Sequence, residues 1–356
     1  MKKSNLFHRI FCYLFALSVF IFVGCSKENE HFEEQTPTQM NTVGEITHTE
    51  GPPADEAVQI TEETTGELQE TTEATADEAV QPEDTVHAED QETPETLAEP
   101  VIKELDLSDY FDGIGGAAVL YDPTDQCYLI YNQELALTRR SPCSTFKIIS
   151  SLIALENEII VPNDSTRTWS GELFWNEEWN TDIDFTDAFH ASCVWYFREV
   201  IDEIGQDMMQ TELNNLQYGN CDISDWAGRL NTNNSNPVLT GFWIESSLLI
   251  SPKEQTEVME RIFGGHAAYS EETLTRLKQV MLLPETAETA ISVYGKTGMG
   301  KAYGIVVDAW FTGFADAADK RIYFCVYLGE TADQNVSSTR AKEIAVKIVT
   351  DYLSAS

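Results

Sequence analysis

The sequence comprises 356 residues and carries 60 acidic against 22 basic side chains, which gives a formal net charge of −38 at pH 7. Such a chain would be repelled by nucleic-acid phosphates, so the charge balance argues against nucleic acid binding. Its seven cysteines show neither CxxC nor Cys/His spacing. This pattern argues against a metal site and a disulfide-rich scaffold, although a disulfide stays open.

The N-terminus has the features of a bacterial export signal. Basic side chains precede an uncharged apolar run at 10–24, which is too short for a comfortable membrane span. We interpret residues 1–24 as a signal peptide. The run ends in Phe22-Val23-Gly24-Cys25, which resembles the lipobox of bacterial lipoproteins. The resemblance implies a lipid on Cys25 and an extracytoplasmic protein anchored to the cell membrane; an ordinary cleaved signal and an uncleaved anchor are the alternatives.

Residues 25–104 are predicted to form an acidic, disordered tether. The segment is rich in Glu, Thr, Ala, Pro and Gln and has few large apolar residues, so it cannot bury enough surface to offset its ordering entropy. A short repeat at 54–59 and 76–81 carries no apolar face, which indicates low-complexity duplication rather than a solenoid. Like charges favour an extended chain that holds the following domain away from the anchoring surface.

Residues 105–356 are predicted to fold as one domain. Two apolar runs at 115–121 and 127–131, separated by a turn-rich tetrad, indicate a β-hairpin. Helical periodicity follows, strand patterns then return, and the chain closes with a helix. The expected helices are 144–157, 186–204, 252–263, 272–282 and 338–353, and the expected later strands are 291–296, 305–315 and 321–328.

This order of elements predicts an α/β (α+β) fold. Strands from both ends of the domain must share one sheet to bury their faces, which gives a mostly antiparallel sheet of five to six strands flanked by helices. The middle of the chain then forms a helical subdomain beside the sheet. We expect a functional site in the cleft between the two parts.

A candidate nucleophile begins the first long helical segment. Ser144 and Lys147 are one turn apart, so the amine can reach the hydroxyl. A serine needs a base to become nucleophilic, and a neutral lysine derivative can supply it. Taken alone, Ser-x-x-Lys recurs by chance, and a capped helix with a surface lysine explains it equally well.

Two further triplets follow in order. Ser192-Cys193-Val194 lies in the helical region, and Lys296-Thr297-Gly298 lies in a strand just before a glycine-rich turn. Together with Ser-x-x-Lys they match the layout of serine β-lactamases and penicillin-binding proteins. Longer segments resemble the class D (oxacillinase-type) β-lactamases over roughly residues 105–353. These segments are Ser141–Ile148, Tyr218–Asn220, Phe242–Glu245, Ile250–Pro252 and Tyr294–Gly298.

The class D resemblance implies a serine β-lactamase that confers antibiotic resistance by hydrolysing β-lactams through an acyl-enzyme on Ser144. In that family the lysine of the first motif, here Lys147, is carboxylated by carbon dioxide to N6-carboxylysine and acts as general base. The resemblance implies no other cofactor, no metal and no obligate protein partner. Burial among apolar groups would lower the pKa of Lys147 and so favour this modification.

Three residues are expected around the modified lysine. Trp243 aligns with the family tryptophan whose indole N–H supports the carbamate, and an indole can only donate. Val194 and Ile244 align with apolar residues that limit water access, and Ile244 is also expected to contact substrate. Without the resemblance Val194 and Ile244 would be interpreted as core residues, and a core role is the alternative for Trp243.

The remaining roles concern charge and proton transfer. Ser192 aligns with the serine that carries a proton to the leaving ring nitrogen, assisted by Lys296. The oxyanion hole is expected from the backbone N–H groups of Ser144 and Met299, where a helix start and a strand edge converge.

Substrate binding is assigned to Thr297, Gly298 and Arg340. Arg340 occupies the place of the family's carboxylate-binding arginine. As a lone arginine on a helix, it would more often be a solvated charge.

The sequence departs from the family at Cys143 and Cys193. Oxidation of these thiols would affect activity if both side chains line the cleft.

Two other functions compete with hydrolysis. A β-lactam sensor or a penicillin-binding domain would be acylated at Ser144 without turnover. Such domains tend to carry asparagine at the third position of the second motif, where this chain has Val194, and this difference favours the enzyme. The segments at 218–220 and 242–245 also argue against a peptidoglycan-processing protein.

Overall fold

The computed structural model describes residues 100–355, except 231–234, 267, 319 and 330–335. The predicted signal peptide, the lipid site at Cys25 and nearly all of the tether lie outside the described residues. Within the described part of the chain, no helix combines the length and the apolar character needed to cross a membrane.

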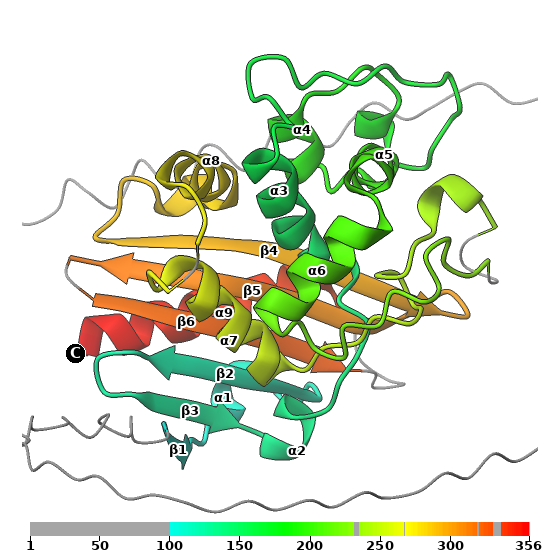
Figure 1. Cartoon of the computed structure of the whole chain (residues 1–356). Helices are drawn as coiled ribbons and strands as arrows, with labels where there is room; N and C mark the ends of the chain where they lie inside the picture. Colours follow the sequence, from blue (N-terminus) through cyan, green and yellow to red (C-terminus); the bar gives the residue numbers. More distant parts are fainter. Residues whose placement is uncertain (1–99, 231–234, 267, 319, 330–335, 356) are drawn as a thin grey trace, which may run out of the picture. The chain divides into compact units, whose positions relative to one another are not determined.

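A six-stranded sheet in the order β1-β3-β2-β6-β5-β4 forms the centre of the domain (Figure 1). All neighbouring strands are antiparallel except β1 and β3, which are parallel. The expected hairpin is present as β2 and β3, and β2 pairs with β6 from the far end of the chain. The predicted fold class is thus confirmed. The strands are β1 Val101–Glu104, β2 Gly116–Asp122, β3 Cys127–Tyr131, β4 Ile291–Ala302, β5 Ile305–Ala317 and β6 Lys320–Gly329.

Alternating side chains of the sheet enter two separate cores. Val119 belongs to a large cluster that also contains Phe146, whereas the adjacent Leu120 belongs to a second cluster with Ile344. This follows from the two-residue period of a strand, which sends successive side chains to opposite faces. Both faces are therefore covered, and every residue of β2 is buried.

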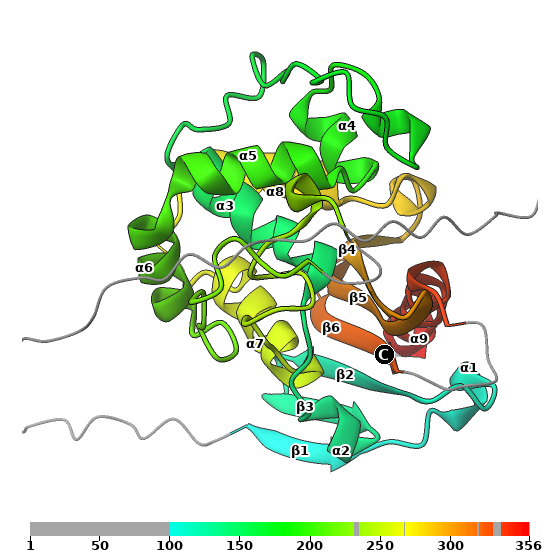
Figure 2. The same cartoon turned by 90° about the vertical axis from the view of Figure 1, so that its right-hand side faces the viewer.

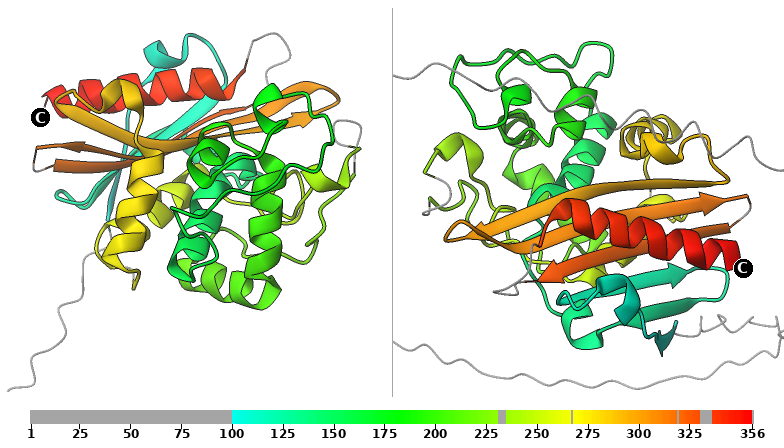
Figure 3. Two further views of the ribbon diagram at one scale, coloured as in Figure 1. Left: turned by 90° about the horizontal axis from the view of Figure 1, so that it is seen from above. Right: turned by 180° about the vertical axis from the view of Figure 1, so that it is seen from behind.

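Helices cover both faces of the sheet. The long C-terminal helix α9 (Ser338–Ala355) lies on one face, and α7 (Pro252–Phe263) lies on the other (Figures 2 and 3). The helical region stands beside α7. Its members are α3 Lys147–Glu156, α4 Phe185–His190, α5 Val194–Ile204, α6 Gln206–Leu216 and α8 Glu271–Met281.

Short elements complete the described fold. They are the helices α1 Ser108–Phe111 and α2 Gln133–Ala136 and the 3-10 turns η1 Cys143–Phe146, η2 Glu177–Trp179, η3 Pro237–Leu239 and η4 Pro284–Thr286.

Helix α3 forms the interior of the helical region. All of its residues except Glu156 are buried, so it is surrounded by protein on every side. Its first residue is Lys147, and the fold therefore places an ionisable amine inside the core.

Four sequence-based boundaries were wrong. The helix expected at 144–157 starts as η1 and becomes α-helical only at Lys147. The helix expected at 186–204 is divided into α4 and α5 by a turn at Ser192. Strand β4 continues through the glycines that were interpreted as a turn and ends at Ala302. Strand β1 lies within the range assigned to the tether and pairs with β3, so the fold begins before residue 105.

Candidate active site

The nucleophile motif is compact and partly enclosed. Ser144 lies in η1, half-buried, and Lys147 Nζ donates a hydrogen bond to Ser144 Oγ at 3.1 Å. Lys147 is only 1% exposed. The amine therefore reaches the hydroxyl, as predicted, and Lys147 is the more deeply buried of the two residues.

Burial changes the acid–base behaviour of Lys147. Loss of solvent disfavours the charged ammonium and lowers its pKa from 10.5 to about 8, whereas the nearby thiols of Cys193 and Cys143 act in the opposite direction. The amine also lies 5.3 Å from the centre of the Phe197 ring. The neutral amine is consequently a minor form at pH 7 and becomes the major form above a pH of about 8.

A second amine–hydroxyl pair joins the sheet to the helical region. Lys296 Nζ on β4 donates to Ser192 Oγ at 3.1 Å, and it also lies 3.2 Å from the Thr297 carbonyl oxygen. Lys296 is 5% exposed, and burial together with the charge of Lys147 holds its pKa well below the usual range. Strand β4, which carries Lys296, packs on the turn that carries Ser144, so the two pairs lie at the same junction.

Three residues at this site have left-handed backbone angles, which are unfavourable for residues other than glycine. Cys143, next to the nucleophile, has φ 48°, Ser192 has φ 57° and Glu245 has φ 50°. Tertiary contacts hold these angles. The Glu245 N–H donates to Ser141 Oγ at 2.8 Å, and its carboxylate accepts the Lys301 N–H at 2.6 Å.

Strand β4 packs directly on the nucleophile turn. A Cβ added to Gly298 would lie 2.9 Å from the Pro142 carbonyl oxygen, and one added to Gly300 would lie 3.1 Å from Cys143 Sγ. Met299 lies between these two glycines. The segments that carry the predicted oxyanion donors, the N–H groups of Ser144 and Met299, are thus adjacent, and their joint role stays a prediction.

Trp243 is attached to the same turn through its backbone. Its carbonyl oxygen accepts the Cys143 N–H at 2.9 Å and the Ser141 hydroxyl at 3.0 Å, while its ring stacks on Phe146 at 6.0 Å. The residue is 1% exposed, so it is a core tryptophan at the site. Its role as a donor to a carbamate stays a prediction.

The apolar candidates border the large hydrophobic core that contains Trp243. Val194 and Ile244 are half-buried and pack against the cluster that contains it.

The residues assigned to substrate binding lie on strand β4 and at the start of helix α9, and the role of Arg340 stays a prediction. Thr297 lines a cavity of about 450 Å³ together with Lys296, Thr339 and Lys342. Arg340 lies in the first turn of α9, where it pairs with Glu343 at 3.3 Å, and it is not among the described residues that line this cavity. The sequence motifs did not identify Lys342 as a candidate for substrate binding, although it follows Arg340 by two positions.

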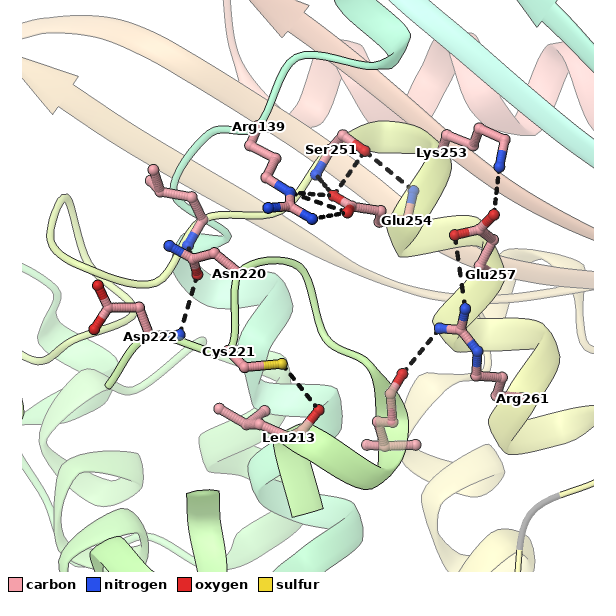
Figure 4. Close-up of polar contacts among 12 residues, drawn as sticks. Arg139, Leu213, Asn220, Cys221, Asp222, Ser251, Lys253, Glu254, Glu257 and Arg261 are labelled. Atoms are coloured by element: carbon pink, nitrogen blue, oxygen red, sulfur yellow. Dashed lines mark hydrogen bonds and ion pairs between the residues drawn. The ribbon is translucent and has the colours of Figure 1, made fainter. Parts of the chain in front are cut away.

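The remaining motifs form polar contacts of their own, and Figure 4 shows those of Arg139, Asn220, Ser251 and Glu254. Asn220 accepts the Leu249 N–H at 2.9 Å and donates to the Ser247 carbonyl oxygen at 2.8 Å. Ser251 and Glu254 form a reciprocal capping box at the start of α7, and Glu254 also binds Arg139. These contacts join the chain that follows Trp243 to Asn220 and to Arg139, which precedes the nucleophile turn.

A family model for the penicillin-binding protein transpeptidase domain matches residues 116–350, more than half of the chain. The chain belongs to this transpeptidase family. Regulatory protein BlaR1 of Bacillus licheniformis is 32% identical over 68% of the chain and 38% of its own length. Beta-lactamase OXA-1 of Escherichia coli is 30% identical over 68% of the chain and 86% of its own length.

A solved structure supports the same family assignment. The C-terminal domain of the Bacillus licheniformis BlaR penicillin receptor has a TM-score of 0.62 and 30% identity, covering 72% of the chain and 98% of that domain. The serine β-lactamase and transpeptidase fold expected from the sequence is confirmed. The chain spans less than half of BlaR1, and a receptor and a β-lactamase resemble it about equally.

The two unusual cysteines of this transpeptidase-family site are enclosed. Cys143 is 1% and Cys193 0% exposed, and burial raises the pKa of the Cys193 thiol to about 11. Neither thiol lines an open cleft, so the condition for the expected effect of oxidation is not met. The five cysteines of the described residues are all free, and no group of side chains suited to a metal ion occurs among those residues.

Proposed function

We propose that this chain is a class D β-lactamase that hydrolyses β-lactam antibiotics through an acyl-enzyme on Ser144 and thereby confers resistance. The 3.1 Å hydrogen bond from the buried Lys147 amine to the half-buried Ser144 hydroxyl carries the proposal. The family assignment and the similarity to OXA-1 support it.

Acylation follows from the arrangement of the two pairs. Ser144 Oγ attacks the ring carbonyl carbon and loses its proton to the base at Lys147. The bond between that carbon and the ring nitrogen breaks, and Ser192 delivers its proton to the nitrogen. The proton that the base removed from Ser144 then replaces it, so the net change is transfer of one proton from Ser144 to the ring nitrogen. Lys296 already donates to Ser192 Oγ, which leaves the serine proton free to turn toward the leaving group.

The surroundings of Lys147 fit carboxylation by dissolved carbon dioxide. A neutral amine is needed for that reaction, and burial lowers the pKa of Lys147 to about 8. The carbamate would supply a general base for the attack of water on the acyl-enzyme. Trp243 is the proposed donor to it, and Val194 and Ile244 would restrict the access of water.

A receptor that is acylated without turnover is the second candidate. The similarity to BlaR1 and to the BlaR penicillin receptor favours it. Val194 supports the hydrolase, because the class D resemblance places valine there and sensors tend to carry asparagine.

We propose in addition that a lipid on Cys25 anchors the protein to the outer side of the bacterial cell membrane. Metabolic labelling with a fatty-acid analogue should mark the full chain and fail to mark Cys25→Ser. Equal labelling of both proteins would contradict the anchor.

Turnover and intact mass, followed together, test the enzymatic proposal. The purified full chain is mixed with a penicillin and a chromogenic cephalosporin in bicarbonate buffer, beside Ser144→Ala and Lys147→Ala. Ser108→Ala and Lys347→Ala serve as matched controls at exposed positions. Multiple turnovers lost only in the first two variants support the hydrolase. A stable one-to-one adduct without turnover supports the receptor instead.

A further inference from the structure

The cavity beside Thr297 lies at the edge of the sheet, at the point where a neighbouring segment stops covering strand β4. Strand β4 is an edge strand, and its first half is covered because Leu283 N–H donates to the Val293 carbonyl oxygen at 2.9 Å and Leu282 bridges Tyr294. The covering chain then turns away at Pro284 into η4. The cavity, about 450 Å³ in volume, begins there and reaches Lys296 and Thr297.

Opposite charges face each other at the outer end of this cavity. Glu285 on η4 and Lys342 on α9 both line it, and their side-chain charges are 3.1 Å apart. A backbone hydrogen bond and the nearby ammonium lower the pKa of Glu285, so its carboxyl group is ionised at neutral pH. The wall between this pair and Lys296 offers the hydroxyls of Ser338 and Thr339.

The proposed reaction decides which part of a ligand reaches the cavity. The carbonyl carbon is bonded to Ser144, and the ring nitrogen is directed to Ser192 and Lys296. The carbon that follows the nitrogen carries the substrate carboxylate, so this half of the ligand must extend past Lys296 and Thr297. In a cephalosporin, a variable substituent lies next to that carbon.

We propose that the cavity binds the nitrogen-side substituent of cephalosporins and that Glu285 and Lys342 select for its charge, an inference that rests on the proposed β-lactam reaction. A ligand with a carboxylate and a cationic substituent replaces the ion pair between Glu285 and Lys342 by two ion pairs with the ligand. Its carboxylate binds Lys342, and its cation binds Glu285. A neutral substituent leaves Glu285 without a partner, so cationic cephalosporins are preferred.

The test compares two cephalosporins that differ only in this substituent, a pyridinium cation and a neutral acetoxy group. Acylation of the full chain by each is measured as the second-order rate constant, which is defined for an enzyme and for a receptor. Glu285→Gln should lower the pyridinium-to-acetoxy ratio about three- to fivefold, the effect of one partly exposed ion pair. Lys342→Gln should slow both reagents and leave the ratio within about twofold.

Glu343→Gln is the matched control, because Glu343 pairs with Arg340 outside the cavity lining. A ratio unchanged in Glu285→Gln, or equally lowered in Glu343→Gln, overturns the inference, while acylation itself still upholds the proposed reaction of Ser144 with β-lactams. The double exchange Glu285→Lys with Lys342→Glu keeps a pair for folding and should also lower the ratio. Failure of both reagents to acylate the unaltered chain instead removes the proposed function.

Discussion

Lys296 and Ser192 are 104 positions apart in the sequence, yet the amine of the first donates to the hydroxyl of the second at 3.1 Å. One residue lies on an edge strand and the other in the turn between α4 and α5, so this bond joins the two halves of the cleft. It also fixes which way the serine proton can point, and several expectations depend on it.

Ser192→Ala removes the group that protonates the leaving nitrogen. Acylation by a penicillin should slow by roughly 10²- to 10⁴-fold, the usual contribution of a positioned proton donor. Stopped-flow acylation kinetics measure this, with Ser108→Ala as the control. A loss smaller than about threefold would show that another group supplies the proton.

The lowered pKa of Lys147 predicts how activity depends on pH. The neutral amine, which is required for carboxylation, is the major form above the pKa of about 8 and is depleted below it. At a fixed concentration of dissolved carbon dioxide, turnover should therefore fall as the pH decreases from 8 to 6, and added bicarbonate should restore part of it. A flat profile with no bicarbonate effect contradicts a carboxylated lysine.

Lys147 is also expected to destabilise the folded protein at neutral pH. Its folded pKa of about 8 lies below the ordinary 10.5, so the unfolded chain binds more protons between these values and stability rises with pH across that window. Below pH 8 the full penalty applies, about 3 kcal/mol for a shift of this size.

Lys147→Met removes that penalty while keeping much of the side-chain volume. In bicarbonate-free buffer the variant should unfold several degrees higher than the original chain at pH 7, and the difference should shrink by pH 10. Thermal unfolding at both pH values measures this. An equal difference at the two values would mean that packing and not charge is responsible.

Gly298→Ala tests the contact between β4 and the nucleophile turn. The added methyl group would lie 2.9 Å from the Pro142 carbonyl oxygen and 2.9 Å from Thr145 Cγ2, so the strand must move away from the turn. A displacement near 1 Å should lower kcat/KM by about 10²-fold.

Gly329→Ala is the control for this strand displacement. The three atoms nearest to its methyl group all belong to the side chain of Tyr327, the first at 3.2 Å. Equal activity of Gly298→Ala and the original chain would mean that the strand position is not critical.

Elements with strong local signals were predicted well from the sequence. The bounds of α7 match those expected, because Pro252 at its first position and the Ser251–Glu254 capping box are both encoded locally. The break between α4 and α5 has no such signal. Apolar periodicity continues through it, and neither glycine nor proline marks Ser192, whose side chain is held by a lysine from a distant strand.

The same distinction applies to the site. Motif order was enough to bring Ser144, Lys147, Ser192 and Lys296 together, because each motif is carried by a short stretch of chain. The pairing of Glu285 with Lys342 joins residues 57 positions apart on η4 and α9. No local pattern encodes that distance, so the outer half of the cavity had to come from the structure.

The left-handed backbone angles at Cys143, Ser192 and Glu245 set the stability of this domain against its catalytic activity. Each such residue raises the energy of the native backbone by roughly 1–2 kcal/mol relative to glycine. All three are at the active site. Substitutions that remove this backbone strain would therefore raise the free energy of unfolding and lower catalytic activity. Variants selected for heat resistance should therefore accumulate glycine at these positions only where selection for the chemistry has been lifted.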